Sequence, residues 1–274
     1  MKLAICNETF QEWPHEKAFE FARQCGYTGV EIAPFTLGKS ALEVGTKQRN
    51  ELRELAERHD LEVIGLHWLL AKTEGSYLTS PEPMVRRRTA EYLRELIRLC
   101  RDLGGQVMVL GSPAQRNLLA GVTPEQGLGY AAETLRAVAD DLAGHEVTLA
   151  LEPLGPEEGN FLLTAASAVE LIERVGSPYC RLHLDVKAMS SESTPVPEII
   201  RKNAEHLVHF HANDPNRRGP GMGEVDFHPI LDALREVGYD GWVSVEVFDY
   251  TPGPEALARE SIQYLRRCWD DLQR

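Results

Sequence analysis

Four short segments in the second half of the chain share one pattern; they read LALE (residues 149–152), LHLD (182–185), VHFH (208–211) and VSVE (243–246). In each segment bulky apolar residues alternate with small or polar ones, and the last residue is a carboxylate or an imidazole. A period of two is typical of β-strands, whose successive side chains point to opposite faces. The pattern therefore predicts four strands, each ending in a side chain that can bind a cation or move a proton.

Similar apolar segments recur along the whole chain, and segments with helical periodicity lie between them. Gly26, Gly104 and Gly176 follow three of the helical segments and suit a helix end, and Thr123 before Pro124 suits a helix N-terminus. The predicted strands cover residues 2–7, 29–34, 62–68, 106–111, 148–153, 180–186, 207–212 and 241–248. The predicted helices cover residues 14–25, 48–59, 85–103, a segment that begins at Thr123, and residues 165–175, 196–204, 228–237 and 254–271.

Eight strand–helix units within 274 residues predict an α/β fold with one domain, a single (β/α)8 TIM barrel over residues 1–274. Strands that alternate with helices pair in parallel through right-handed crossovers. An open doubly wound sheet fits less well, because the turn after the first strand lacks the GxGxxG motif that holds a dinucleotide.

The composition excludes several classes of partner. The chain carries 29 basic and 42 acidic side chains, which gives a formal net charge of −13. Nucleic acids and anionic membrane surfaces are bound mainly by Lys and Arg, so neither is an expected partner. No segment approaches the roughly 18 apolar residues of a membrane span, and the five scattered cysteines form neither a CxxC motif nor a disulfide framework. We expect a soluble protein of a reducing compartment, the cytoplasm.

Strand alternation places the polar residues of the four segments in two layers. TIM-barrel enzymes carry their active sites at the C-terminal ends of the strands. The layer at this rim consists of Glu152, Asp185, His211 and Glu246, and the layer below it of Ala150, His183, His209 and Ser244. A single acidic residue at a strand end is commonly a cap or an ion-pair partner, but four in register on consecutive strands favour a shared site.

That shared site is predicted to hold a metal. Three neighbouring carboxylates repel one another unless a cation neutralises them. We therefore expect one divalent ion per chain, bound by the four rim residues. Mn²⁺ or Mg²⁺ suits the oxygen-rich set best, and Zn²⁺ or Co²⁺ is also compatible. His183 and His209, one layer down, are interpreted as residues that orient the ligands. His67 and Trp68, at the end of the third strand, are candidate substrate contacts. A structural role is equally open for His67, and an aromatic residue such as Trp68 at a loop is more often the edge of the core than the wall of a sugar pocket.

The segments LALEPL, RLHLDV, VHFHANDPNRRGPGMGEVDF and WVSVEVF resemble the xylose-isomerase-like TIM-barrel superfamily of sugar and sugar-phosphate isomerases and epimerases. The resemblance spans the chain and is closest to the ketose 3-epimerases of the D-tagatose/D-psicose type. It implies that the four rim residues bind the metal and that Glu152 and Glu246 exchange protons with the substrate. It also implies that Glu158 and Arg217 contact substrate oxygens.

One position departs from the epimerase pattern. Those enzymes carry a histidine three residues after the metal-binding aspartate, and this chain has Ala188 there. Lys187 is a candidate replacement, but strand alternation would point it away from the side of Asp185. We therefore expect a substrate other than an ordinary ketohexose: one that is smaller or less polar at this point, or one with an oxidised or phosphorylated end reached by Arg217 or Arg218.

The predicted reaction is metal-dependent isomerisation or epimerisation of a sugar or sugar phosphate through an enediolate, with the two glutamates as acid and base. A small carbohydrate is the expected partner, and a homodimer or homotetramer is compatible with the sequence. A dehydratase similar to inosose dehydratase is the main alternative, because the same intermediate can expel water. An aldose–ketose isomerase, including a hydroxypyruvate-isomerase type, is another.

Two further alternatives fit the sequence less well. The same barrel occurs in AP endonucleases, and Asp226 with His228 offers a pair of extra ligands, but the acidic charge opposes DNA binding. A non-catalytic sugar-sensing barrel does not explain why both Glu152 and Glu246 are present.

Overall fold

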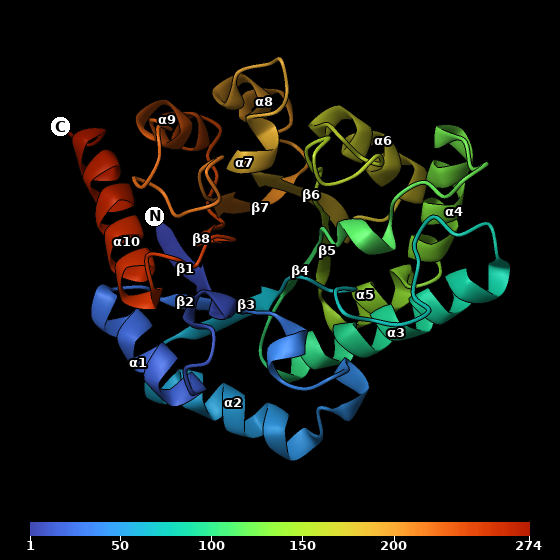
Figure 1. Ribbon diagram of the computed structural model, residues 1–274, viewed down its shortest axis with the longest axis horizontal. Coiled ribbons are helices and arrows are strands. Elements are labelled where there is room, and N and C mark those ends of the chain that lie inside the picture. The colour runs from blue at the N-terminus through green and yellow to red at the C-terminus, as the bar shows by residue number, and fades with distance from the viewer.

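The computed structural model describes all residues, 1–274, and its eight parallel strands form a closed barrel. Each strand pairs with the next along the chain, and the last strand pairs with the first through Leu3–Val243 and Ile5–Val245. Figure 1 shows the strands at the centre and the helices around them. The strands are β1 (Lys2–Cys6), β2 (Gly29–Ile32), β3 (Glu62–Leu66), β4 (Val107–Leu110), β5 (Thr148–Leu151), β6 (Cys180–Asp185), β7 (Leu207–Ala212) and β8 (Trp242–Val245). The predicted (β/α)8 TIM barrel is confirmed.

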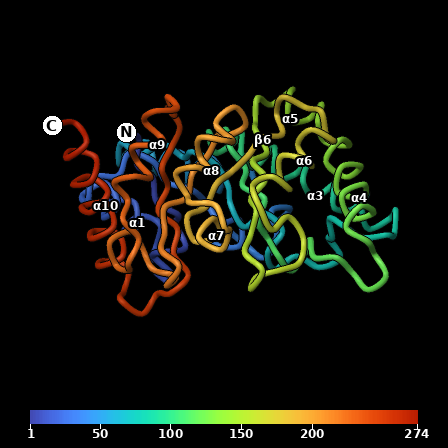
Figure 2. The backbone as a smooth tube through the Cα atoms, turned by 90° about the horizontal axis from the view of Figure 1, so that it is seen from above, coloured from blue at the N-terminus to red at the C-terminus, as the bar shows by residue number.

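The helices form a ring outside the barrel. They are α1 (His15–Cys25), α2 (Thr46–Arg58), α3 (Pro83–Asp102), α4 (Pro124–Arg136), α5 (Ala139–His145), α6 (Ala165–Val175), α7 (Val186–Met189), α8 (Val196–Lys202), α9 (His228–Glu236) and α10 (Pro254–Asp271). Figure 2 shows α1 beside α10, so the ring closes where the first and last helices meet. None of the helices combines the length and the apolar composition that crossing a bilayer requires.

Most helix ends follow their sequence signals. Gly26 ends α1 in the left-handed region, with φ of 103°. Thr123 begins α4 with a capping box, in which its side chain accepts from the Gln126 amide and the Gln126 side chain accepts from the Thr123 amide. The sequence analysis did not predict α5 or α7, the latter a single turn that directly follows β6.

The apolar residues of the alternating segments form the core between the barrel and the helices. Leu149, Leu151, Leu182, Leu184 and Phe210 are all buried in one continuous cluster with the inner faces of the helices. The residues that alternate with them point into the barrel, where His183 on β6 lies beside His209 on β7. This arrangement leaves the polar strand ends at one rim.

Three of the four strands that carry the predicted ligands are shorter than expected, while β7 has the predicted bounds. We predicted strands to residues 153, 186 and 248, but β5, β6 and β8 end at Leu151, Asp185 and Val245. Glu152 and Glu246 are therefore the first residues after their strands, at the start of the loops above the barrel.

Candidate active site

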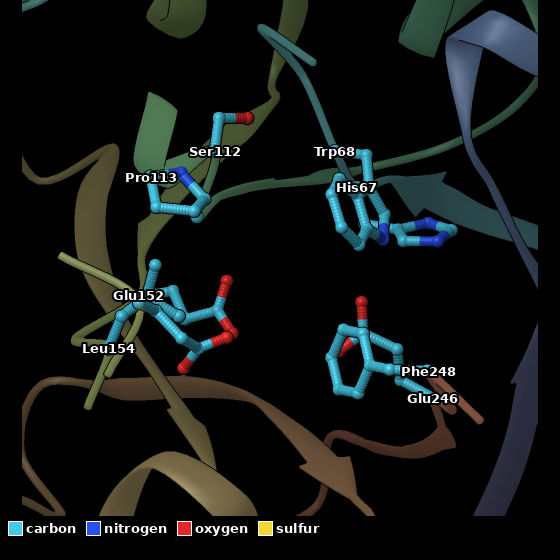
Figure 3. Close-up of a pocket in the computed structure, with 10 residues that line it drawn as sticks. His67, Trp68, Ser112, Pro113, Glu152, Leu154, Glu246 and Phe248 are labelled. Atoms are coloured by element: carbon cyan, nitrogen blue, oxygen red, sulfur yellow. The ribbon is translucent and has the colours of Figure 1, made fainter. Parts of the chain in front are cut away.

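A cavity opens at the C-terminal ends of the strands. Figure 3 shows Glu152 and Leu154 on one side of it and Glu246 and Phe248 on the other. The residues that line it follow β3, β4, β5 and β8: His67, Trp68, Gly111, Ser112, Pro113, Glu152, Leu154, Glu158, Glu246 and Phe248. Gly111 leaves room for the Glu152 carboxylate, because a Cβ atom at this position would overlap Oε2 and force that carboxylate to move.

Three of the predicted metal ligands form a tight, buried group. Ligand atoms of Glu152, Asp185, His211 and the deeper His183 all lie within 4.8 Å of one another. Asp185 is held in place from both sides: its Oδ1 accepts from the Ala188 amide at 2.8 Å, and its Oδ2 accepts from the Asn213 side chain. A carboxylate with fixed oxygens needs little rearrangement to bind a cation.

Glu246, the fourth predicted ligand, lies next to this group. Its Oε2 atom is 3.0 Å from Nδ1 of His211. Its other close neighbours form a second buried group, in which ligand atoms of Cys6, Glu8, His67 and Glu246 lie within 4.8 Å of one another. The structure thus brings the four predicted ligands to one place, with Glu246 hydrogen-bonded to His211.

Charge repulsion within the site supports a bound cation. Burial, together with the nearby Glu246 and Asp185 carboxylates, raises the pKa of Glu152 well above its usual value. Burial and the charge of Glu246 raise the pKa of Asp185 to about 6. A divalent ion at this place would offset the cost of ionising these carboxylates, because its positive charge stabilises their ionised forms. Three carboxylates and one imidazole are a donor set that divalent metals accept, so the residues fit such an ion.

The two glutamates that face each other across the cavity differ electrostatically. Burial alone would raise the pKa of Glu246, but the charge and hydrogen bond of His211 lower it. The pKa of Glu152 is raised. Without a metal, Glu246 therefore favours the ionised form and Glu152 the protonated form, which is the asymmetry that an acid–base pair needs.

Glu31, on β2, is a functional candidate that the sequence analysis missed. Its Oε2 atom lies 2.9 Å from Nε2 of His209 and 3.1 Å from Nε2 of His211. Burial opposes its charge, yet the two imidazoles hold its pKa well below the usual value. A register shift between Val30 and Glu31 accompanies this inward placement. An acidic residue between Val30 and Ile32 in an apolar strand is the signal that could have identified it.

Two other buried charged residues were missed. Glu8 follows β1, and its Oε2 atom lies 2.6 Å from Nε2 of His67, which lines the cavity. Arg116 donates to the backbone carbonyls of Leu110 and Glu152, at 3.1 and 2.6 Å. Arg116 therefore fixes the backbone that carries Glu152. Glu8 lies in a 3-10 turn and Arg116 directly follows another, and strand periodicity gives no signal at either place.

His183 and His209 lie under the rim layer, as predicted, but their surroundings differ. Nε2 of His209 faces Glu31. Neither ring nitrogen of His183 has a hydrogen-bond partner, and burial together with the neighbouring His211 and His209 lowers its pKa well below the usual value. His183 is thus a neutral imidazole packed against His211, at 4.1 Å between ring centroids.

Of the four predicted substrate contacts, His67, Trp68 and Glu158 line the cavity. Trp68 also packs edge-on against Phe248, at 6.1 Å between ring centroids. Arg217 instead lines an adjoining cavity that shares Glu158 with the first. Arg217 has φ of 73°, a conformation that is strained for a non-glycine residue.

The expected orientation of Lys187 is wrong. Strand alternation does not apply to it, because β6 ends at Asp185 and α7 begins at Val186. The helical turn brings the Lys187 ammonium to 2.7 Å from Oε2 of Glu158. Arg218, by contrast, is engaged elsewhere, since its Nε donates to Asp249 at 2.8 Å.

The pair that suggested extra nuclease-type ligands lies at the surface. Nδ1 of His228 is 2.7 Å from Asp226, and its Nε2 faces Asp271 of α10 at 3.5 Å. The His228 side chain is 42% exposed. These contacts explain Asp226 and His228 as surface residues at the start of α9, as the sequence suggested.

The sequence and the fold are similar to those of sugar epimerases. Residues 19–268 match the family described as xylose isomerase-like TIM barrel. A probable ketose 3-epimerase of Synechocystis is 25% identical over 93% of this chain and 91% of that protein. A D-psicose 3-epimerase of Enterocloster bolteae is 28% identical over 87% and 79%, respectively. A solved structure of an L-ribulose 3-epimerase matches with a TM-score of 0.87 at 25% identity, covering 100% of this chain and 96% of that one.

Proposed function

The chain belongs to the xylose isomerase-like TIM-barrel family, and we propose that it is a divalent-metal-dependent ketose 3-epimerase. Its relatives are epimerases that act on ketoses, so the protein is an enzyme of the carbohydrate isomerase and epimerase class. The observation that carries the finer proposal is the pair Glu152 and Glu246, which face each other across the cavity above buried Asp185 and His211.

Glu152, Asp185, His211 and Glu246 would hold the ion. The ion, when bound, would supply a Lewis acid that polarises the substrate carbonyl and stabilises the negative charge of the enediolate. Mn²⁺ or Mg²⁺ suits the oxygen-rich donors best, and Zn²⁺ or Co²⁺ is compatible. The chain contributes a preformed set of ligands, since Asn213 and the Ala188 amide already orient Asp185.

Glu152 and Glu246 would exchange the protons. Glu246 and Glu152 lie on opposite sides of the cavity, so one suits removal of the proton beside the carbonyl and the other suits delivery to the opposite face. Removal from one face and delivery to the other inverts the carbon. Each proton transfer of this kind typically contributes 10²–10⁴-fold to the rate. The reverse reaction exchanges the two roles.

The walls of the cavity would position the sugar. Trp68 and Phe248 offer flat apolar faces, while His67 and Glu158 offer polar atoms at the same surface. The Arg217 side chain, in the adjoining cavity, would reach the part of the substrate that passes Glu158.

The test is product identification. The purified protein, loaded with Mn²⁺, is incubated with tagatose, psicose, fructose and ribulose, and the products are separated by chromatography. The proposal predicts the 3-epimer of at least one ketose. An ultraviolet-absorbing dehydration product in place of an epimer would identify the dehydratase alternative, and an aldose would identify an aldose–ketose isomerase.

A further inference from the structure

We propose that Lys187 is a substrate-binding residue that determines specificity: together with Glu158 it recognises the carbonyl and adjacent hydroxyl of an α-hydroxyketone. This inference rests on the proposed function and adds to it. It concerns the lysine next to Ala188, the position at which this chain departs from the epimerase pattern.

The position of Lys187 is fixed by the turn that follows β6. Its backbone amide donates to Oδ1 of Asn213 at 2.8 Å, the same side chain whose Nδ2 donates to Asp185. The Lys187 ammonium lies 2.7 Å from Oε2 of Glu158 and 4.9 Å from the ring centroid of Phe248. Both of these neighbours line the cavity. The Lys187 side chain is only 14% exposed, and it lines the adjoining cavity, whose wall also includes Glu158 and Arg217.

Ala188, the next residue, cannot donate a hydrogen bond to the substrate. Its side chain is a methyl group, and its amide already donates to Asp185 at 2.8 Å. A substrate oxygen that loses water beside this methyl group needs a donor from elsewhere. The ammonium of Lys187 has three N–H donors, and the contact with Glu158 occupies one of them.

The ion pair matches a ketol in chemistry. Lys187 can only donate, whereas an ionised Glu158 can only accept. The carbonyl oxygen of an α-hydroxyketone accepts, and its neighbouring hydroxyl donates. The two substrate oxygens would therefore find complementary partners in Lys187 and Glu158, and the cation would also favour negative charge that develops on the carbonyl oxygen. The substrate class is a ketose with its ketol group unmodified.

The experiment compares Lys187→Met with wild type in Mn²⁺-loaded enzyme, on the ketose that wild type epimerises fastest. Lysine and methionine have similar length, but methionine has neither the charge nor the donors. We expect kcat/KM to fall on the order of 10- to 100-fold, the effect of an unpaired buried polar group. The variant should still fold and hold one metal per chain, so that neither misfolding nor loss of the ion explains the fall.

Two further variants test the assignment. Lys202→Met is the matched control, since Lys202 pairs with Glu198 on α8 and is well exposed; it should behave as wild type. Adding Ala188→His to Lys187→Met should restore part of kcat/KM, because the imidazole supplies a new donor at the neighbouring position. Lys187→Gln removes the charge but keeps N–H donors, so it tests the charge by itself if Lys187→Met does not fold.

The outcomes separate the two proposals. Wild-type kcat/KM in folded Lys187→Met and Lys187→Gln, on a ketose that the enzyme does epimerise, would overturn the role of Lys187 and leave the epimerase function intact. A wild-type enzyme that epimerises no ketose would overturn the proposed function itself.

Discussion

Nε2 of His211 lies 3.1 Å from Oε2 of Glu31, and Nδ1 of the same ring lies 3.0 Å from Oε2 of Glu246. An ionised carboxylate can only accept, so Glu31 keeps a proton on Nε2 of His211. Nδ1 faces the site beside Glu246, which likewise holds a proton there, so Nδ1 is the atom that would release its proton to bind an ion. Glu31 thus orients His211 in the way that outer carboxylates orient metal-binding histidines in other proteins.

Replacing this carboxylate should weaken metal binding. Glu31→Gln can donate to Nε2 and so favours the other tautomer, in which Nδ1 carries the proton. We expect the metal Kd, measured by isothermal titration calorimetry, to rise about 10- to 100-fold. Glu133→Gln is the control, because Glu133 pairs with Arg86 on the helix ring. Equal affinity of Glu31→Gln and wild type would show that His211 is oriented without Glu31.

Removing a ligand should remove the ion. Asp185→Ala deletes a buried carboxylate that two hydrogen bonds hold in place. We expect elemental analysis after gel filtration to give well under one metal per chain, against one per chain for wild type. A full complement of metal in the folded variant would show that Asp185 is not a ligand.

The two glutamates should each be needed for turnover. Glu152→Gln and Glu246→Gln keep the size of the side chain but cannot exchange a proton. We expect each to lower kcat by about 10²–10⁴-fold at saturating metal. Glu170→Gln, on the exposed face of α6, should retain wild-type kcat. Wild-type turnover of either active-site variant would exclude that glutamate from proton transfer.

Metal binding should weaken as the pH falls. Burial and Glu246 raise the pKa of Asp185 to about 6, and burial raises that of Glu152 as well. Below these values the ion must displace protons, so the Kd should rise by about tenfold per pH unit for each proton released. Above them the carboxylates are already ionised, and the proton that remains to be displaced is that of His211, whose pKa burial would lower but the charges of Glu246 and Glu31 raise well above its usual value. A calorimetric series from pH 8 to pH 5 measures this, and a constant Kd would contradict the burial of these carboxylates.

The fold was predictable because local patterns determine it. Alternating segments and helix-end signals identified all eight strands within a few residues, and the capping box at Thr123 is present. The sequence did not predict α7, since a single turn after β6 is too short to show a helical period. That omission caused the wrong orientation of Lys187, because alternation was extended one element too far.

The site was predictable only where it lies on the strands. Glu152, Asp185, His211 and Glu246 come from consecutive strand ends, so register alone placed them together. Which groups pair with them depends on tertiary structure. Arg116 reaches Glu152 from a loop, and Glu31 reaches His211 across the barrel after a register shift. No local pattern records contacts between elements so distant in sequence.

The central claim is proton exchange at the carbon beside the carbonyl, and the direct measurement is the reaction in D₂O. Mn²⁺-loaded enzyme is incubated with the preferred ketose, and carbon-bound deuterium is located by NMR early in the reaction. The account predicts one deuterium at carbon 3 of the epimerised product. Epimerised product without deuterium at carbon 3 would contradict proton transfer through Glu152 and Glu246, because protons on carboxyl groups exchange with solvent.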